Sequence, residues 1–321
     1  MTTELTTQST DLLLPLAEVA EQAKEYARSA KASNTRRAYA ADWADFERWC
    51  AIHDLPALPA APETVALYLT ALAEQRKVAT LQRRITAISQ AHETLQFDSP
   101  TRSLVVRTVM AGIRRTKGTA QRRKAPAVTT VLRAMVETLP PTLLGTRDHA
   151  LLLLGFAGAF RRSELVSLDL DDLLFSDDGI TVTLRRSKTD QEGQGRTIGI
   201  PYGSHPLTCP VRALRAWIAG AGLVAGPLFR PLNRHGKVLE RRLSDKGVAR
   251  IVKRAAAAAG YDPDTFSGHS LRAGLATAAA AAGVSERAIM NQTGHRSVTV
   301  ARRYIREGSL FRENAAASIG L

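Results

Sequence analysis

The sequence contains no apolar run that approaches the ~20 residues needed to cross a bilayer as a helix. The stretch up to Thr10 has Glu4 as its one charged side chain, so the basic start of a secretory signal is missing. Cysteine occurs only at Cys50 and Cys209, outside any CxxC or Cys/His cluster, which argues against a structural zinc site and a disulfide framework. By elimination, we expect a cytoplasmic protein with two reduced thiols and no membrane partner.

The motifs of metal-dependent and nucleotide-dependent phosphate chemistry are also missing. Asp and Glu residues do not cluster in a way that would hold two metal ions, and no glycine-rich P-loop occurs. We therefore expect that the protein uses neither a metal ion nor an organic cofactor.

Positive charge is abundant. The 321 residues include 44 Lys and Arg against 30 Asp and Glu, a formal net charge of +14, which favours a polyanionic partner, nucleic acid first. No acidic residue occurs between Asp98 and Glu137, although a run of cations is often only a solvated surface. We predict that cations of this interval contact DNA phosphates, namely Arg114, Arg115, Lys117, Arg122, Arg123 and Lys124.

The N-terminal third has the pattern of a small helical bundle. Residues 1–30 are predicted to be a tail and the start of a first helix. Apolar residues then recur at helical spacing from Tyr39 to Cys50, with Ser33 or Asn34 available as the N-cap. Three further helices are predicted, over residues 63–74, 80–95 and 102–115. Residues 31–116 are therefore expected to form an all-helical domain.

A basic segment at 117–127 that contains Gly and Pro is predicted to link this domain to a second one over 128–321. The second domain has helical patterns on both sides of two β-branched stretches at 179–186 and 196–201. These are predicted to be antiparallel strands joined by a polar, Gly-rich hairpin loop at 187–195. The predicted fold class is mainly α with a small antiparallel sheet, in which the second domain is α+β.

Four segments of the second domain carry residues suited to phosphate chemistry. In the first, Arg161 follows an apolar run, and Glu164 lies three residues on, on the same helical face, where it can orient the arginine. In the second, Lys188 lies in the hairpin loop, where most lysines are simply exposed. Each of these residues, taken alone, has an ordinary explanation as a surface charge.

The third and fourth segments lie nearer the C-terminus. If a helix begins just after His269, that side chain is at the helix N-terminus and Arg272 is in the first turn, so both can face one anion. His295 follows Gly294, which fits a helix-ending glycine, and Tyr304 comes nine residues later on a basic helix. A lone histidine is as often structural as functional.

Together, the four segments resemble the tyrosine recombinase family, which includes the phage integrases, the Cre recombinase and the Xer resolvases. The family pattern is an Arg in an Arg-x-Ser-Glu-Leu helix, a hairpin Lys, His-x-x-Arg, a Gly-His or Gly-Trp, and a Tyr nine residues beyond. The chain departs from the pattern at Arg162, where an apolar residue is usual, and the resemblance covers nearly all of it after residue 30. The matching residues are Arg161, Glu164, Lys188, His269, Arg272, His295 and Tyr304.

The resemblance implies a site-specific DNA recombinase that needs no metal and no ATP. Tyr304 would attack the scissile phosphate and form a covalent 3′-phosphotyrosyl intermediate, although a tyrosine hydroxyl is a weak nucleophile without fixed cations and a base. The other residues would supply phosphate-binding donors (Arg161, Arg272, His295), a proton acceptor (His269), a proton donor to the leaving 5′ oxygen (Lys188) and an orienting carboxylate (Glu164).

By the same resemblance, the two domains form a C-shaped clamp on double-stranded DNA with an inverted-repeat core site, and residues 31–116 are the core-binding domain. Four protomers pair two sites and exchange strands through a Holliday junction, whereas the protein off DNA is a monomer or associates weakly. The apolar residues Leu310, Phe311 and Ile319 predict a C-terminal helix that docks on a neighbouring protomer or, alternatively, on its own. The expected setting is integration, excision or resolution of a mobile element or plasmid at the bacterial nucleoid, with room for an accessory protein.

Two other interpretations stay open at this point. A DNA-binding protein could keep this fold without catalysis, although the complete residue set argues against it. A type IB topoisomerase would share the chemistry, and the Cre-like helical domain and C-terminal segment favour recombination over it.

Overall fold

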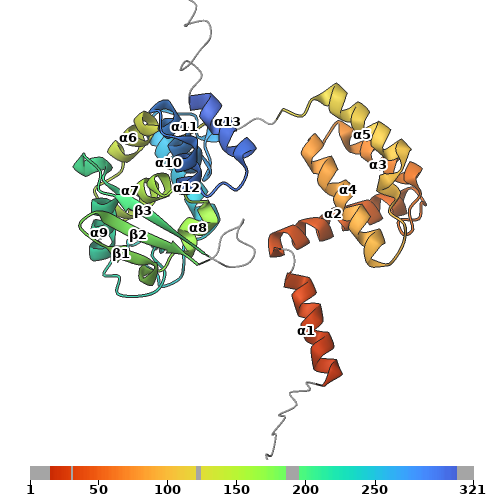
Figure 1. Cartoon of the computed structure of the whole chain (residues 1–321), viewed down its shortest axis with the longest axis horizontal. Helices are drawn as coiled ribbons and strands as arrows, with labels where there is room; N and C mark the ends of the chain where they lie inside the picture. The colour runs from red at the N-terminus through yellow and green to blue at the C-terminus, as the bar shows by residue number, and fades with distance from the viewer. Residues whose placement is uncertain (1–14, 30–31, 121–123, 186–194, 309–321) are drawn as a thin grey trace, which may run out of the picture. The chain divides into compact units, whose positions relative to one another are not determined.

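The computed structural model describes residues 15–29, 32–120, 124–185 and 195–308 (Figure 1). The chain divides into two compact units, the N-terminal unit Met1–Gln121 and the C-terminal unit Arg122–Leu321. No helix within the described ranges is long and apolar enough to cross a membrane.

The N-terminal unit is helical throughout its described residues. Its elements are α1 (Leu16–Ser29), α2 (Ser33–Ile52), α3 (Pro62–Ala73), α4 (Val78–Thr94), the 3-10 turn η1 (Pro100–Arg102) and α5 (Leu104–Lys117). Phe46 of α2, Tyr68 of α3 and Ile88 of α4 are completely buried and form one core with their neighbours. This core follows from the helical spacing of apolar residues in the sequence.

The predicted N-cap of α2 is wrong. Ser33 and Asn34 both lie inside the helix, and Ala32 occupies the cap position without a side-chain hydrogen bond. The Asn34 side chain instead accepts a hydrogen bond from Arg37 in the first turn of the helix. The sequence indicates a cap only by residue type. Here both residues of a suitable type are part of the helix instead of preceding it.

The C-terminal unit contains one small sheet. Its strands are β1 (Leu173–Phe175), β2 (Gly179–Leu184) and β3 (Arg196–Pro201), antiparallel in the order β1-β2-β3. The predicted strands correspond to β2 and β3, with Val182 opposite Ile198. The sequence does not predict β1, because three residues are too few to establish an alternating pattern. The predicted hairpin loop lies outside the described residues, except for Gly195.

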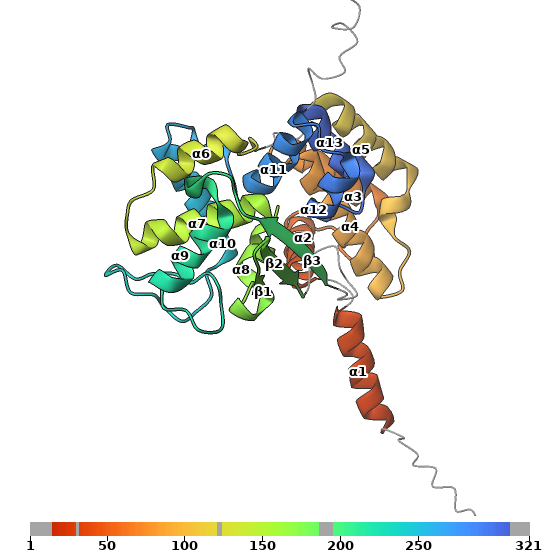
Figure 2. The same cartoon turned by 60° about the vertical axis from the view of Figure 1, so that its left-hand side comes forward.

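The remaining elements of the C-terminal unit are helices and 3-10 turns. They are α6 (Thr129–Glu137), α7 (Leu143–Ala157), α8 (Arg162–Ser167), α9 (Pro210–Gly220), α10 (Asp245–Ala258), α11 (Ser270–Ala281), α12 (Glu286–Thr293) and α13 (Val298–Gly308), with 3-10 turns η2 (Leu170–Asp172), η3 (Pro206–Thr208) and η4 (Pro263–Thr265). Figure 2 shows α7 among α6, α9 and α10, each of which it contacts.

The core of this unit is built on α7. Leu151, Leu152 and Leu154 are completely buried, as the strongly apolar stretch predicts. Trp217 of α9 is buried beside them, and its Nε1 donates to the carbonyl oxygen of Leu228, 2.8 Å away. Since burial of each such side chain stabilises the fold by ~1.5–3 kcal/mol, this core fixes the helices that carry the candidate site.

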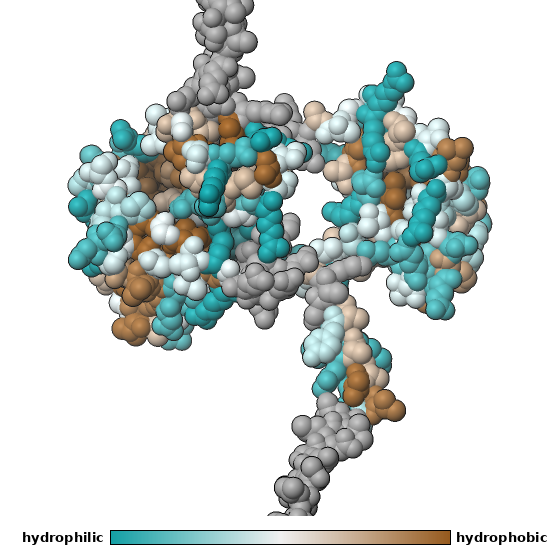
Figure 3. All heavy atoms as spheres, in the orientation of Figure 1, coloured by the Kyte–Doolittle hydropathy of each residue, from teal (hydrophilic) through white to brown (hydrophobic). Residues whose placement is uncertain are grey.

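Polar side chains project from the visible face of both units (Figure 3). In the same view, hydrophobic atoms gather on the sheet side of the C-terminal unit. The exposed hydrophobic residues of this unit include Leu174 at 67% and Val224 at 93%.

Candidate active site

Helix α11 presents two of the predicted residues at its N-terminus. His269 holds the N-cap position, and Arg272 lies in the first turn, where it is 1% exposed. Arg272 Nη1 donates to the carbonyl oxygen of Ala159, 2.7 Å away. Its Nη2 is buried and has no hydrogen-bond partner among the described residues. Because an unpaired buried donor costs ~1–3 kcal/mol, this guanidinium favours binding of an acceptor in the site.

Arg161 lies next to this arginine, at the start of α8. It is the N-cap residue, and its backbone N–H donates to Glu164 Oε2 at 2.9 Å in a capping box. The Arg161 guanidinium also donates to Oε1 of Glu164, which is 2% exposed. The sequence predicts both residues on one helical face, and this placement is wrong because Arg161 precedes the helix. The carboxylate nevertheless binds and orients the guanidinium.

Tyr304 of α13 contacts both histidines. Its hydroxyl oxygen lies 2.7 Å from His269 Nε2, and its ring stacks on that of His295, with centroids 5.7 Å apart and 18° between the planes. His295 follows Gly294, which ends α12 in the left-handed conformation, and its Nδ1 lies 2.8 Å from Thr293 Oγ1. The tyrosine and its hydrogen-bond partner therefore belong to the same chain.

Packing holds α13 in this position. Tyr304 and Ile305 pack against a small apolar cluster of α11 and α12 that includes Ile289. Arg302 Nε also pairs with Glu286 of α12 at 2.9 Å. Since an exposed ion pair contributes only ~0–1 kcal/mol, the apolar contacts dominate this attachment.

Burial and positive charge control titration in the site. Burial, Arg272 and Arg161 lower the pKa of His269. Burial and the same two arginines lower the pKa of His295 to about 4. Burial and Arg161 lower the pKa of Arg272 to about 10. Lowered pKa values are expected where cationic groups lie close together and are shielded from water. The site is therefore suited to an anion, and His269 is neutral at pH 7.

The structure adds Arg196, which sequence reasoning missed. Arg196 Nη1 donates to the carbonyl oxygens of Asn291 and Gln292, and Nη2 lies 4.0 Å from Oε2 of Glu164. In the sequence it is only an arginine at the start of a predicted strand, without a motif to mark it. Within the described residues, no group of three or more His, Cys, Asp or Glu is placed to hold a metal ion.

Other predicted residues are placed less informatively. Lys188, Arg122 and Arg123 lie outside the described residues. In the N-terminal unit, the Arg114 guanidinium donates to Gln82, Lys117 pairs with Glu74 at 2.7 Å, and Arg115 is exposed. In the C-terminal unit, Lys124 donates to the carbonyl oxygen of Asp264. The structure thus brings together six of the seven predicted site residues, namely Arg161, Glu164, His269, Arg272, His295 and Tyr304.

The site thus brings a tyrosine hydroxyl into hydrogen-bond distance of a neutral histidine, beside the buried Arg272 and the partly buried Arg161, a set of groups that can serve phosphate chemistry. Comparison with known proteins identifies the particular family. A model of the phage integrase family matches residues 127–309. The chain belongs to this family, the tyrosine recombinases; it is Xer-like and is a site-specific recombinase.

Individual relatives agree. The chain is 44% identical over 298 residues to an integrase/recombinase XerD homolog of Selenomonas ruminantium, a match that covers 92% of this chain and 87% of the relative. It is 25% identical to the Cre recombinase of Escherichia phage P1, over 80% of this chain and 79% of Cre. Among solved structures, a lambda integrase dimer bound to a COC′ core site superposes with a TM-score of 0.59 at 17% identity, covering 91% of this chain and 95% of that one. XerH bound to a palindromic difH substrate superposes with a TM-score of 0.57 at 17% identity, over 80% and 70% of the two chains.

Proposed function

We propose that the protein cuts and rejoins DNA by attack of the Tyr304 hydroxyl on a scissile phosphate. The observation that carries the proposal is the 2.7 Å contact between Tyr304 Oη and His269 Nε2, beside the buried guanidinium of Arg272. The Oη–phosphorus bond forms as the bond to the 5′ oxygen breaks, which leaves a 3′-phosphotyrosyl link and a free 5′ hydroxyl. Because this link conserves the bond energy, the reverse attack reseals a strand without ATP.

Both proton transfers have a candidate residue. The tyrosine proton passes to His269 Nε2, which is neutral at pH 7 because burial and the arginines lower its pKa. Lys188 belongs to the segment between β2 and β3 and is proposed to protonate the departing 5′ oxygen. Separate donors and acceptors allow the two transfers to accompany one displacement.

The phosphate itself would bind to the cations. Arg161 and Arg272 each offer a planar pair of donors to the non-bridging oxygens, whose negative charge grows in the transition state. His295 adds a donor, and Glu164 holds Arg161 in place through two hydrogen bonds. Loss of one such donor reduces rates by ~10²–10³ in comparable oxyanion sites.

The proposed partner is double-stranded DNA with an inverted-repeat core site. The formal net charge of +14 supports it, and so do the lambda integrase dimer on a core site and XerH on a palindromic substrate. The two units would clamp the duplex, with Arg115 at the end of α5 among the phosphate contacts. An accessory protein is compatible with this arrangement.

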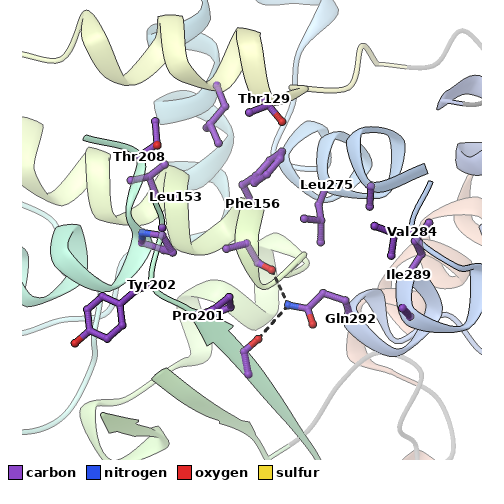
Figure 4. A pocket seen from close by; sticks show the side chains of 17 residues that line it. Thr129, Leu153, Phe156, Pro201, Tyr202, Thr208, Leu275, Val284, Ile289 and Gln292 are labelled. Carbon is purple, nitrogen blue, oxygen red and sulfur yellow. Dashed lines mark hydrogen bonds between the residues drawn. The ribbon is translucent and has the colours of Figure 1, made fainter. Parts of the chain in front are cut away.

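On paired sites we propose a homotetramer, linked by the C-terminal segment of each protomer. Support comes from an apolar cavity of about 480 Å³ in the C-terminal unit, lined by Leu153, Phe156, Leu275, Val284 and Ile289 among others (Figure 4). The C-terminal segment carries Leu310, Phe311 and Ile319, whose apolar side chains match this lining. Each protomer would then insert its segment into the cavity of a neighbour.

A nicked suicide substrate tests the chemistry. Cleavage releases a short fragment that bears the free 5′ hydroxyl, and its loss by diffusion prevents religation and traps the adduct. Wild type should give a covalent protein–DNA band, and Tyr304→Phe should give none while binding the site normally. Tyr261→Phe is the matched control, since the ring of this tyrosine packs edge-on against Phe266 and Tyr261 is not one of the predicted site residues. Absence of the adduct for wild type on DNA that it binds would refute the proposal.

Recombination itself needs a second assay. A plasmid with two copies of the site should yield deletion or inversion products, whereas a topoisomerase would only relax supercoils. The proposed setting is integration, excision or resolution of a mobile element or plasmid, and an inverted repeat beside the gene would supply the test site.

A further inference from the structure

Arg196, the first residue of β3, connects the sheet to the end of α12. Its side chain is 21% exposed, and Nη1 donates to the carbonyl oxygens of Asn291 at 3.3 Å and Gln292 at 3.2 Å. Both carbonyls belong to the last turn of α12, where a helix leaves backbone acceptors unpaired and carries partial negative charge. A guanidinium satisfies both needs at once.

A second contact fixes the same turn. Gln292 Nε2 donates to the carbonyl oxygens of Ala157 at 2.7 Å and Gly199 at 3.3 Å, which joins α12 to α7 and β3 (Figure 4). A Cβ atom on Gly294 would lie 2.7 Å from Arg196 Nη1, so the guanidinium packs directly against the glycine that ends the helix. The turn that precedes His295 is therefore held from the side of the sheet.

The other amino group of Arg196 faces the proposed phosphate site. Nη2 lies 4.0 Å from Oε2 of Glu164, is buried, and has no hydrogen-bond partner among the described residues. Arg272 Nη2 is likewise buried without a hydrogen-bond partner among the described residues. The charge of Arg196 contributes to lowering the Arg272 pKa. Arg196 thus reaches both the carboxylate that orients Arg161 and the turn that leads to His295.

We infer that Arg196 is a positioning residue of the recombination site, which holds the last turn of α12 against β3 and thereby places His295 on the scissile phosphate. The inference rests on the proposed function. It also gives a reason why the hairpin strand that follows Lys188 begins with an arginine, because one guanidinium fixes the base of the hairpin and the histidine together. Lysine offers no planar pair of donors and can replace Arg196 only in part.

The first test follows the His295 ring by NMR titration of the full-length protein without DNA. Burial, together with Arg272, Arg161, His269 and Arg196, lowers the His295 pKa to about 4 in the wild type. Arg196→Gln should raise this pKa toward its ordinary value, because it removes a cation and frees the turn. Arg230→Gln is the matched control: Arg230 also donates to two backbone carbonyls, those of Pro227 and Ala225.

The second test measures single-turnover cleavage of the suicide substrate at saturating protein. Arg196→Gln should cleave on the order of 10²-fold more slowly with DNA affinity unchanged, and Arg196→Lys should recover part of the loss. If Arg196 acts through His295, the double variant with His295→Ala should cleave within about twofold of His295→Ala alone. A merely structural role would multiply the two losses. Should Arg196→Gln not fold, Arg196→Lys carries both tests.

The outcomes separate the two proposals. An unchanged His295 pKa, together with cleavage close to that of wild type in both Arg196 variants, would overturn the positioning role. Full multiplication of the losses in the double variant would overturn it as well. If wild type forms no adduct but the His295 pKa rises in Arg196→Lys, which keeps the positive charge, the proposed function fails while the placement of His295 by Arg196 stands.

Discussion

The cationic residues of the site that the structure describes are arginines, whose side chains keep their positive charge when they are buried. Arg272 is 1% exposed, and its pKa, although lowered to about 10, still leaves it protonated at neutral pH. A lysine at the same place has a lower ordinary pKa and would lose its proton more readily. The same environment lowers the pKa of both histidines as well, and because their ordinary pKa of about 6.5 is already below 7, they are neutral at pH 7. The site thus combines permanent cations with uncharged imidazoles.

This difference predicts how stability depends on pH. The folded pKa of His295, about 4, lies below the ordinary value of about 6.5, so the unfolded chain binds a proton first. The stability that the neutral His295 contributes is therefore fully present above pH 6.5 and is lost as the pH falls toward 4. Between pH 6.5 and pH 4, the melting temperature should fall less for His295→Gln than for wild type. Thermal unfolding at several pH values measures this difference.

Carboxylates also titrate at low pH, so the comparison between variants is what carries this prediction. The exposed His235 provides a control, and His235→Gln should follow the wild-type curve. Equal slopes for wild type and His295→Gln would contradict the lowered pKa.

The spacing of residues in the sequence identifies the site residues that belong to a motif, but it does not identify the residues that hold them in place. Tyr304 and His295 could be named because the tyrosine lies nine positions beyond the histidine, as in the family pattern, and a short helix carries the tyrosine. Arg196 could not be named, because its role depends on α12 lying against β3, a contact between residues ~95 positions apart that no local pattern encodes.

At the scale of elements, helix ends place the chemistry. Arg161 precedes α8, His269 caps α11 and His295 follows α12, so three site residues lie at helix termini. The sequence predicts the start of α11 and the glycine that ends α12, since both have local signals. It misplaces Arg161 within a helix, because the residue that breaks the backbone after the Gly158 cap, with φ +49, is Ala159, a residue type that ordinarily favours helix.

Close packing of α11 predicts a sharp cost for one methyl group. A Cβ atom on Gly274 would overlap the carbonyl group of Ala127, whose N–H donates to Ser270 O at 2.9 Å. Gly274→Ala should therefore destabilise the protein by ~1–3 kcal/mol and slow cleavage, because α11 carries His269 and Arg272. Denaturant unfolding and the suicide-substrate assay measure the two effects.

The matched control is another helical glycine. Gly112 in α5 has no atom within 4 Å of a built Cβ, and Gly112→Ala should stabilise its helix by ~0.5–1 kcal/mol. Equal stability of the two alanine variants would show that the close approach at Gly274 is not a constraint.

At the scale of the whole molecule, positive charge supports the proposed contact with DNA. The formal net charge is +14, yet many cations are already paired within their own unit, as Lys117 is with Glu74 and Arg102 with Glu93. Paired cations release fewer counterions from DNA, because their charge is partly neutralised before binding. The sequence predicts the basic surface but cannot separate paired from unpaired cations, which requires the fold of each unit.

Arg115 and Arg102 make this distinction measurable. Both lie in the N-terminal unit and are exposed, but Arg102 pairs with Glu93 at 2.7 Å, whereas Arg115 has no ion-pair partner among the described residues. If Arg115 contacts a phosphate, Arg115→Gln should weaken binding about equally on all sequences and reduce the slope of log affinity against log salt by about 1. Arg102→Gln should leave the slope unchanged. Fluorescence anisotropy over a range of salt concentrations measures both slopes, and identical slopes for the two variants would remove Arg115 from the proposed DNA contact.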